Sequence, residues 1–353
     1  MTITLTELAR KAGVSIATVS RALNNTDHPM NEATRARILA IANEVGYRPN
    51  MVARSLKTDR TYTIGLIVDN IVSPFTPTII RGIQDYLKLH NYFSVIINAD
   101  WNPELETEAI HQLISRSIDG IIFVESHLRG TNSILDLANK PYVFVHRLFS
   151  GTFGNWVLVD EPYGARLAVE HLAKLGHRRI AFINGPHGWD AAANRLLGYQ
   201  ETLAQMGLPY DPDLVVEGNW EVQGGYPAAK KLLSLAQRPT AIFAANDLMA
   251  LGAIYAIQEL GLRVPEDVAI VGYDNREITS ISRPTITTVV LPCYEMGETS
   301  AQMLLRRLEN PGEVEDPIRV RGRLVIRESC GAEEGKTPPD RYQTHTTPPE
   351  LLT

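Results

Sequence analysis

The feature that most constrains the fold is an alternation, from residue 63 onward, of short apolar runs and longer amphipathic stretches. Nine continuous runs of four to six residues are typical of strands: 63–68, 93–98, 120–124, 142–145, 179–183, 214–217, 241–244, 268–271 and 286–290. Helical spacing of apolar residues marks the stretches 77–90, 104–117, 162–176, 193–206, 224–236 and 247–260. Apolar strands separated by helices predict parallel sheets covered on both faces. This number of strands favours two doubly wound halves, the second beginning near Tyr163, with the chain crossing between them near residues 160, 290 and 320.

Composition excludes several classes of protein. The chain has 353 residues, 44% of them hydrophobic and 21% charged, which suits two or three globular domains. It contains no apolar run of membrane-spanning length, and its first residues mix acids and bases, so we expect no membrane span, no signal peptide and a cytoplasmic, nucleoid-associated protein. The only cysteines are Cys293 and Cys330, in no metal-ligand spacing, which argues against a disulfide scaffold and a zinc site.

The net charge of −6 is distributed unevenly. Residues 1–60 hold nine basic and five acidic side chains, a net of +4, so the remainder carries −10. A small basic segment joined to an acidic body is typical of a nucleic-acid reader with a separate second domain. An excess of four charges is modest, however, and chance clustering alone could produce it.

The basic segment predicts three short helices. Thr4 and Glu7 have the spacing of a capping box for a helix that ends at Gly13. Ser15 follows as the cap of a second helix, 16–23, and Asn31 caps a third, 32–45. Two short helices joined by a glycine-containing turn indicate a helix-turn-helix. The alternative is a three-helix module that binds no DNA.

The amino-acid sequence of the second helix favours DNA binding. Residues 14–21 read V-S-I-A-T-V-S-R, preceded by LTELARKAG and followed by NEVGYRPNMVARSLKT. These motifs resemble the lactose-repressor/galactose-repressor (LacI/GalR) family of bacterial transcription regulators, and the resemblance extends to about residue 330. It implies an all-α helix-turn-helix head at 1–49 and a hinge helix at 50–60. It also implies an α/β, two-lobed, periplasmic-binding-protein-like core at 61–330, built on two doubly wound parallel sheets.

The resemblance also implies which residues meet DNA. In such proteins the start of the second helix lies in the major groove. Ile16, Ala17 and Arg21 then face base edges, and the Arg21 guanidinium suits guanine O6 and N7. Phosphate contacts fall to Ser15, Thr18, Ser20 and Asn24. We expect Val19 to belong to the core instead. In the hinge, Leu56 is the expected minor-groove wedge, with Ala53 beside it and Lys57 near phosphate.

Four positions in the second half match the family's effector-binding pattern: Arg195, Trp220, Asn246 and Asp274. A guanidinium, an amide and a carboxylate suit the hydroxyls of a sugar, and an indole face suits its C–H side. Taken alone, Asp274 could be a turn carboxylate and Trp220 a core residue. In the first half the candidates are Asp69, Phe75, His146 and Arg147. His146 stands where many relatives have an acid, and Cys293 where many have an aromatic ring.

These features together predict a DNA-binding regulator, most simply a repressor of carbohydrate genes. It would bind a palindromic operator as a homodimer and respond to a small sugar-type effector, with no cofactor. A solute-binding protein with the same core is the alternative, but it would need export. An enzyme is disfavoured, because no phosphate-binding loop, dinucleotide fingerprint or nucleophile–base pair is present. The last residues, 331–353, contain four prolines and no leucine heptad, so we expect a disordered tail and no tetramerising coiled coil.

Overall fold

The structure is a computed structural model, and it describes residues 3–24, 30–48, 60–131, 137, 139–149, 155–311 and 316–332. The chain divides into two compact units, Met1–Tyr62 and Thr63–Thr353. The expected hinge helix at 50–60, apart from its last residue, lies outside the described residues, as does the expected tail beyond residue 332.

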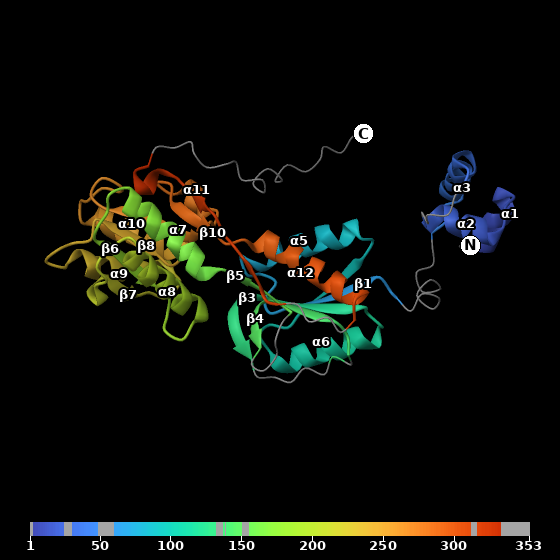
Figure 1. Cartoon of the computed structure of the whole chain (residues 1–353), viewed down its shortest axis with the longest axis horizontal. Coiled ribbons are helices and arrows are strands. Elements are labelled where there is room, and N and C mark those ends of the chain that lie inside the picture. The colour runs from blue at the N-terminus through green and yellow to red at the C-terminus, as the bar shows by residue number, and fades with distance from the viewer. Residues whose placement is uncertain are drawn as a thin grey trace. The chain divides into compact units, whose positions relative to one another are not determined.

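The described residues of the N-terminal unit form a bundle of three helices: α1 (Leu5–Ala12), α2 (Ile16–Asn24) and α3 (Glu32–Glu44) (Figure 1). The capping box forms as predicted, because the Glu7 backbone N–H donates to Thr4 and the Glu7 carboxylate accepts from the Thr4 backbone N–H. Gly13 ends α1 with φ +64°, a conformation that glycine adopts without strain. The helices pack around one small core, in which Leu8, Val19 and Ile38 are fully buried.

The second unit contains two six-stranded sheets. The first sheet has the order β11-β5-β4-β3-β1-β2. Its strands are β1 (Thr63–Val68), β2 (Phe93–Asn98), β3 (Gly120–Thr131), β4 (Tyr142–Phe149), β5 (Trp156–Val159) and β11 (Ile318–Val320). The second sheet has the order β12-β10-β9-β8-β6-β7. Its strands are β6 (Ile180–Asn184), β7 (Val215–Glu217), β8 (Ala241–Ala244), β9 (Ala269–Asp274), β10 (Thr287–Val290) and β12 (Leu324–Val325).

Helices cover both faces of each sheet, so each sheet with its helices forms a lobe (Figure 1). Lobe one carries α5 (Thr76–Leu89), α6 (Pro103–Ser115) and α12 (Cys293–Glu309). Lobe two carries α7 (Glu161–Lys174), α8 (Asp190–Gln205), α9 (Val222–Leu233), α10 (Asp247–Glu259) and α11 (Ile278–Ile281), with short 3-10 turns η1 (Pro212–Leu214) and η2 (Glu328–Cys330). All paired strands are parallel except β10 and β12, which confirms the predicted doubly wound architecture.

The chain crosses between the lobes three times, as predicted: between β5 and α7, between β10 and α12, and between β11 and β12. Three strands were not predicted, namely β5, β11 and β12. Each has only two to four residues and lies at or next to the edge of a sheet. Its formation therefore depends on pairing with a neighbouring strand more than on the hydrophobic pattern of its own sequence. The long helix α12 was also missing from the expected stretches, although it packs against α5.

Candidate functional site

The exposed face of α2 carries the residues expected to read bases. Ile16 is 46% exposed, and Ala17 and Arg21 are also exposed, whereas Val19 is fully buried as predicted. The helix therefore has one face in the small core and a separate face that is open to a partner. Arg21 lies on that open face, where its guanidinium can reach a groove.

The residues expected to contact phosphate have mixed positions. Ser15 caps α2, because its Oγ accepts from the Thr18 backbone N–H at 3.1 Å, and the two hydroxyls lie 2.8 Å apart. Ser20 is half-buried on the same helix. Asn24 ends α2, but its side chain lies outside the described part of the structure. The hinge candidates Ala53, Leu56 and Lys57 also lie outside the described residues.

A cleft of about 480 Å³ lies between the two lobes, at the carboxyl ends of their strands. Ligands of open α/β sheets bind at this edge, and the volume is in the range of small-molecule pockets. Six of the residues predicted for the effector line it: Phe75, His146, Arg195, Trp220, Asn246 and Asp274. The side chain of Arg147, in β4, lies outside the described part of the structure.

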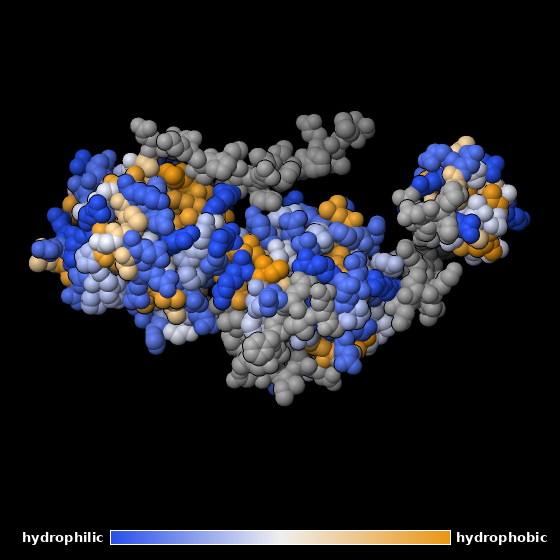
Figure 2. Space-filling view, viewed as in Figure 1, coloured by the Kyte–Doolittle hydropathy of each residue, from blue (hydrophilic) through white to orange (hydrophobic). Residues whose placement is uncertain are grey.

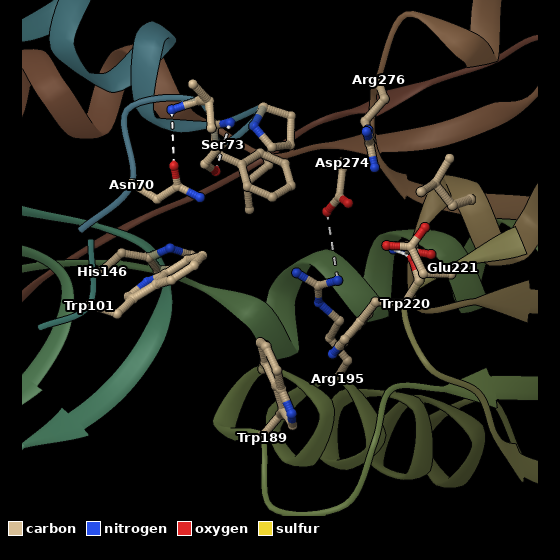
Figure 3. A pocket seen from close by; sticks show the side chains of 17 residues that line it. Asn70, Ser73, Trp101, His146, Trp189, Arg195, Trp220, Glu221, Asp274 and Arg276 are labelled. Atoms are coloured by element: carbon tan, nitrogen blue, oxygen red, sulfur yellow. Dashed lines mark hydrogen bonds and ion pairs between the residues drawn. The ribbon is translucent and has the colours of Figure 1, made fainter. Parts of the chain in front are cut away.

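Arg195 is buried on α8, at the floor of the cleft (Figure 3). Its Nε and Nη2 donate to the Glu161 carboxylate at 2.8 and 3.1 Å, and its Nη1 donates to the Ala245 carbonyl. We expected the N–H groups of this guanidinium to face the ligand, but two of them are directed at Glu161. Nη1 also lies 3.7 Å from Asp274, so the guanidinium holds two carboxylates together.

Glu161 is a functional candidate that sequence reasoning missed. It is only 2% exposed and begins α7, directly after the crossing from lobe one. Burial opposes its charge, yet the Arg195 guanidinium holds the pKa of Glu161 below its usual value. A glutamate in the first turn of a helix ordinarily faces solvent, so nothing in the sequence separated this one from the rest.

Asp274 ends β9 with φ +105°, a backbone conformation that non-glycine residues rarely adopt. Burial raises its pKa well above the usual range, opposed by Arg195 and reinforced by the negative charges of Asp247 and Glu161. Asp247 is fully buried beneath it, and burial raises the pKa of Asp247 to about 7. The cleft floor thus gathers the carboxyl groups of Glu161 and Asp274 around one buried guanidinium, an arrangement that disfavours an anionic ligand.

Asn246 lines the cleft and also makes two hydrogen bonds within the protein. Its Oδ1 caps α10 by accepting from the Met249 backbone N–H, and its Nδ2 donates to the Trp220 carbonyl at 2.8 Å. Both ends of the amide are therefore used within the protein. Asn246 fixes the backbone of Trp220, which has φ +68°.

Trp220 lies against Gly185, where a Cβ atom would come within 2.1 Å of the indole ring. Its ring meets Trp189 edge to face, with centroids 5.7 Å apart. Its Nε1 is buried and has no hydrogen-bond partner among the described residues.

Asp69 is not among the residues that line the cleft, and it contacts two of them instead. Its carboxylate accepts from Trp101 Nε1 at 2.7 Å and from the Asn70 backbone N–H. The cleft is lined instead by Asn70 and Trp101 in lobe one, and by Trp189 and Arg276 in lobe two. Sequence reasoning missed both tryptophans, although each follows a strand, β2 or β6, at the same carboxyl edge as the residues that it found.

Among the described residues there is no group of three or more side chains arranged to hold a metal ion. No helix in this part of the chain is long and apolar enough to cross a membrane.

Comparison with known proteins decides the family. Residues 4–50 match the model of bacterial regulatory proteins of the lacI family, and residues 169–330 match a periplasmic binding protein-like domain. The regulator RegA of Clostridium saccharobutylicum is 36% identical over 93% of this chain and 99% of its own length. The repressor CytR of Escherichia coli (strain K12) is 37% identical over 87% of this chain and 90% of its own length. The chain belongs to the lacI family of bacterial regulatory proteins.

Solved structures agree with this assignment. A lac repressor dimer bound to operator is similar to this chain with a TM-score of 0.70 and 30% identity, covering 93% of this chain and 99% of that one. A complex of the regulator CelR with cellobiose gives a TM-score of 0.63 and 33% identity, with the same coverage. This lacI-family protein is therefore a DNA-binding transcriptional regulator, with a helix-turn-helix head and a periplasmic-binding-protein-like core. The relatives named here are regulators rather than enzymes.

Proposed function

We propose that this regulator represses carbohydrate genes by binding a palindromic operator as a homodimer, and that a neutral sugar in the interlobe cleft changes its affinity for that operator. The observation that carries the proposal is the composition of the cleft. A carboxyl group and a guanidinium, Asp274 and Arg195, lie on its floor, and aromatic rings line both walls. Hydroxyl groups pair with the first two and C–H faces with the rings.

The charges that line the cleft favour a neutral ligand. Two arginines, Arg195 and Arg276, and two acidic residues, Glu221 and Asp274, line the cleft. The Arg195 guanidinium is already shared with Glu161 outside that set. A phosphorylated sugar would therefore meet little excess positive charge. The cellobiose named in the CelR complex supports the same class of ligand.

Operator reading is assigned to α2. Arg21 donates to a guanine, Ile16 and Ala17 contact apolar base edges, and Ser15, Thr18, Ser20 and Asn24 contact phosphates. On the resemblance alone, Leu56 enters the minor groove with Ala53 beside it and Lys57 near phosphate.

The dimer is supported by apolar side chains on the surface of lobe two. Figure 2 shows hydrophobic side chains near α11, where Ile281 is 61% exposed, and Tyr255 of α10 is 50% exposed. Contiguous apolar surface of this kind is typical of a face that packs against another protein. A two-fold dimer presents two copies of α2 to the two halves of a palindrome.

The test uses the full chain and an operator selected from random duplexes. Operator binding is followed by fluorescence anisotropy at fixed salt, with a panel of neutral sugars added in turn. The proposal expects one sugar to shift the operator Kd, and Asp274→Asn to remove that shift while operator binding survives. Selection of no preferred duplex, or an equal shift in Asp274→Asn, would contradict the proposal.

A further inference from the structure

Trp101 presents an aromatic surface that the fold holds in place without covering. It follows β2 at the carboxyl edge of lobe one and has φ +54°. Its Nε1 donates at 2.7 Å to Asp69, which is only 7% exposed, yet Trp101 itself remains 46% exposed and lines the cleft. The polar edge of the indole is therefore anchored inward, and much of the ring is left for a ligand.

A second aromatic surface lies on the opposite wall. Trp189 and Trp220 form an edge-to-face pair in lobe two, close to Arg195, whose Cζ lies 5.7 Å from the Trp220 ring centroid. Figure 3 shows Trp101 and His146 on one side of the cleft and Trp189, Trp220 and Arg195 on the other. The two aromatic surfaces thus belong to different lobes.

Each surface has its own polar groups. Beside Trp189 and Trp220 are the carboxyl group of Asp274 and the guanidinium of Arg195. On the lobe-one wall with Trp101 are the amide of Asn70 and the hydroxyl of Ser73 (Figure 3). An aromatic face with adjacent hydrogen-bonding groups is what one hydroxyl-rich ring requires, and the cleft provides this combination twice.

The volume of the cleft agrees with two rings. A single hexose has roughly the volume of six waters at about 30 Å³ each. It would therefore fill less than half of the cleft of about 480 Å³. Two linked rings would fill most of it and would contact both lobes.

We propose that the effector is a neutral oligosaccharide with at least two pyranose rings, one at Trp220 and Asp274 and the next stacked on Trp101. This inference rests on the proposed sugar-controlled function and narrows it. A nucleoside is disfavoured because its flat base would stack on one aromatic surface but present few hydroxyl groups to the polar groups beside that surface.

The test is calorimetry on the full chain with three kinds of probe. These are β-linked and α-linked glucose and galactose disaccharides, the methyl glycosides of their single rings, and the nucleosides cytidine and adenosine. We expect the preferred disaccharide to bind about tenfold more tightly than its methyl glycoside. Trp101→Ala should remove most of that difference and leave the methyl glycoside within about twofold, because only the second ring reaches Trp101. Trp101→Phe keeps an aromatic ring, so it should retain part of the difference in affinity between the disaccharide and its methyl glycoside.

Phe93→Ala is the matched control, since Phe93 is 69% exposed in the same lobe but does not line the cleft. It should leave every affinity unchanged. A disaccharide that binds no better than its methyl glycoside would overturn this inference. So would a disaccharide whose affinity is unchanged in Trp101→Ala but lost in Asp274→Asn. Either result would leave the proposed function standing. Binding of a nucleoside in place of all sugars would overturn both.

Discussion

Glu161 accepts two hydrogen bonds from the Arg195 side chain, from Nε at 2.8 Å and from Nη2 at 3.1 Å, and both side chains are buried. Glu161 stands where the chain has just crossed from lobe one, and Arg195 lies on the floor of the cleft beside Asp274. The ion pair therefore links the crossing segment to the ligand-binding floor. Because these hydrogen bonds hold the Arg195 side chain in place, Arg195 in turn positions the carboxyl group of Asp274, which lines the cleft.

Glu161→Gln should destabilise the core strongly. Loss of this charge deprives the buried Arg195 guanidinium of the carboxylate to which it donates, and breaking a buried pair typically costs about 3–5 kcal/mol. Urea unfolding of the full chain measures the change, and effector affinity should fall with it as Arg195 moves. The matched control is Glu170→Gln in the same helix, whose pairs with Arg166 and Lys174 are partly exposed. That change should cost about 1 kcal/mol or less. Equal losses in the two variants would contradict the role given to Glu161.

Asp247 should make the stability of the core fall as pH rises. Burial raises its folded-state pKa to about 7 from an ordinary value of 3.8, so the folded protein retains a proton that the unfolded chain releases. Its contribution is therefore fully present below about pH 4 and is lost as pH rises to about pH 7. The lowered pKa of Glu161 acts in the opposite sense at acid pH.

Asp247→Asn isolates this contribution. The amide can still accept from the Arg276 backbone N–H and donate to the Thr288 hydroxyl, which now donates to Asp247. Unfolding free energies at pH 5, 6, 7 and 8 should decline less steeply in the variant than in the wild type. Parallel curves would show that Asp247 does not retain the proton.

Gly185→Ala should impair effector binding without altering any hydrogen-bonding group of the cleft. The new Cβ atom would come within 2.1 Å of the Trp220 ring and displace it. The loss of sugar affinity should approach that of Trp220→Ala. In the double variant the two losses should not add, because both act on the same ring. Fully additive losses would show that Gly185 acts elsewhere.

Arg21→Ala should weaken operator binding by about 1–3 kcal/mol and relax the preference for one base pair in each half-site. Arg21→Lys is the control, since it keeps the charge but loses the two-point fork. Anisotropy titrations against operators changed at single positions distinguish the two variants. Losses of equal size on all duplexes would indicate that Arg21 contacts phosphate instead.

The sequence predicted those features of the fold that depend on local chemistry. The spacing of Thr4 and Glu7 predicts the start of a helix, and continuous apolar runs predict buried strands. Edge strands such as β12 escaped prediction, because two residues carry no periodicity of their own.

The cleft was predicted in outline, because Asn246 and Asp274 each follow a predicted strand at the carboxyl edge of a sheet. The partners of its side chains could not be predicted, because they are separated by tens of residues. Arg195 meets Glu161 and Asn246 meets the Trp220 carbonyl only once the strands and helices are assembled. For the same reason, the sequence did not show that the Asp69 carboxylate accepts a hydrogen bond from Trp101 Nε1.

The central claim is that a ligand in the cleft controls operator affinity, and reciprocal titration tests it most directly. The operator Kd is measured with and without a saturating concentration of the active sugar, and the sugar Kd with and without saturating operator. Both dissociation constants should change by the same factor in the wild type, and neither should change in Asp274→Asn. An operator Kd that no sugar alters, or a factor that persists in Asp274→Asn, would contradict it.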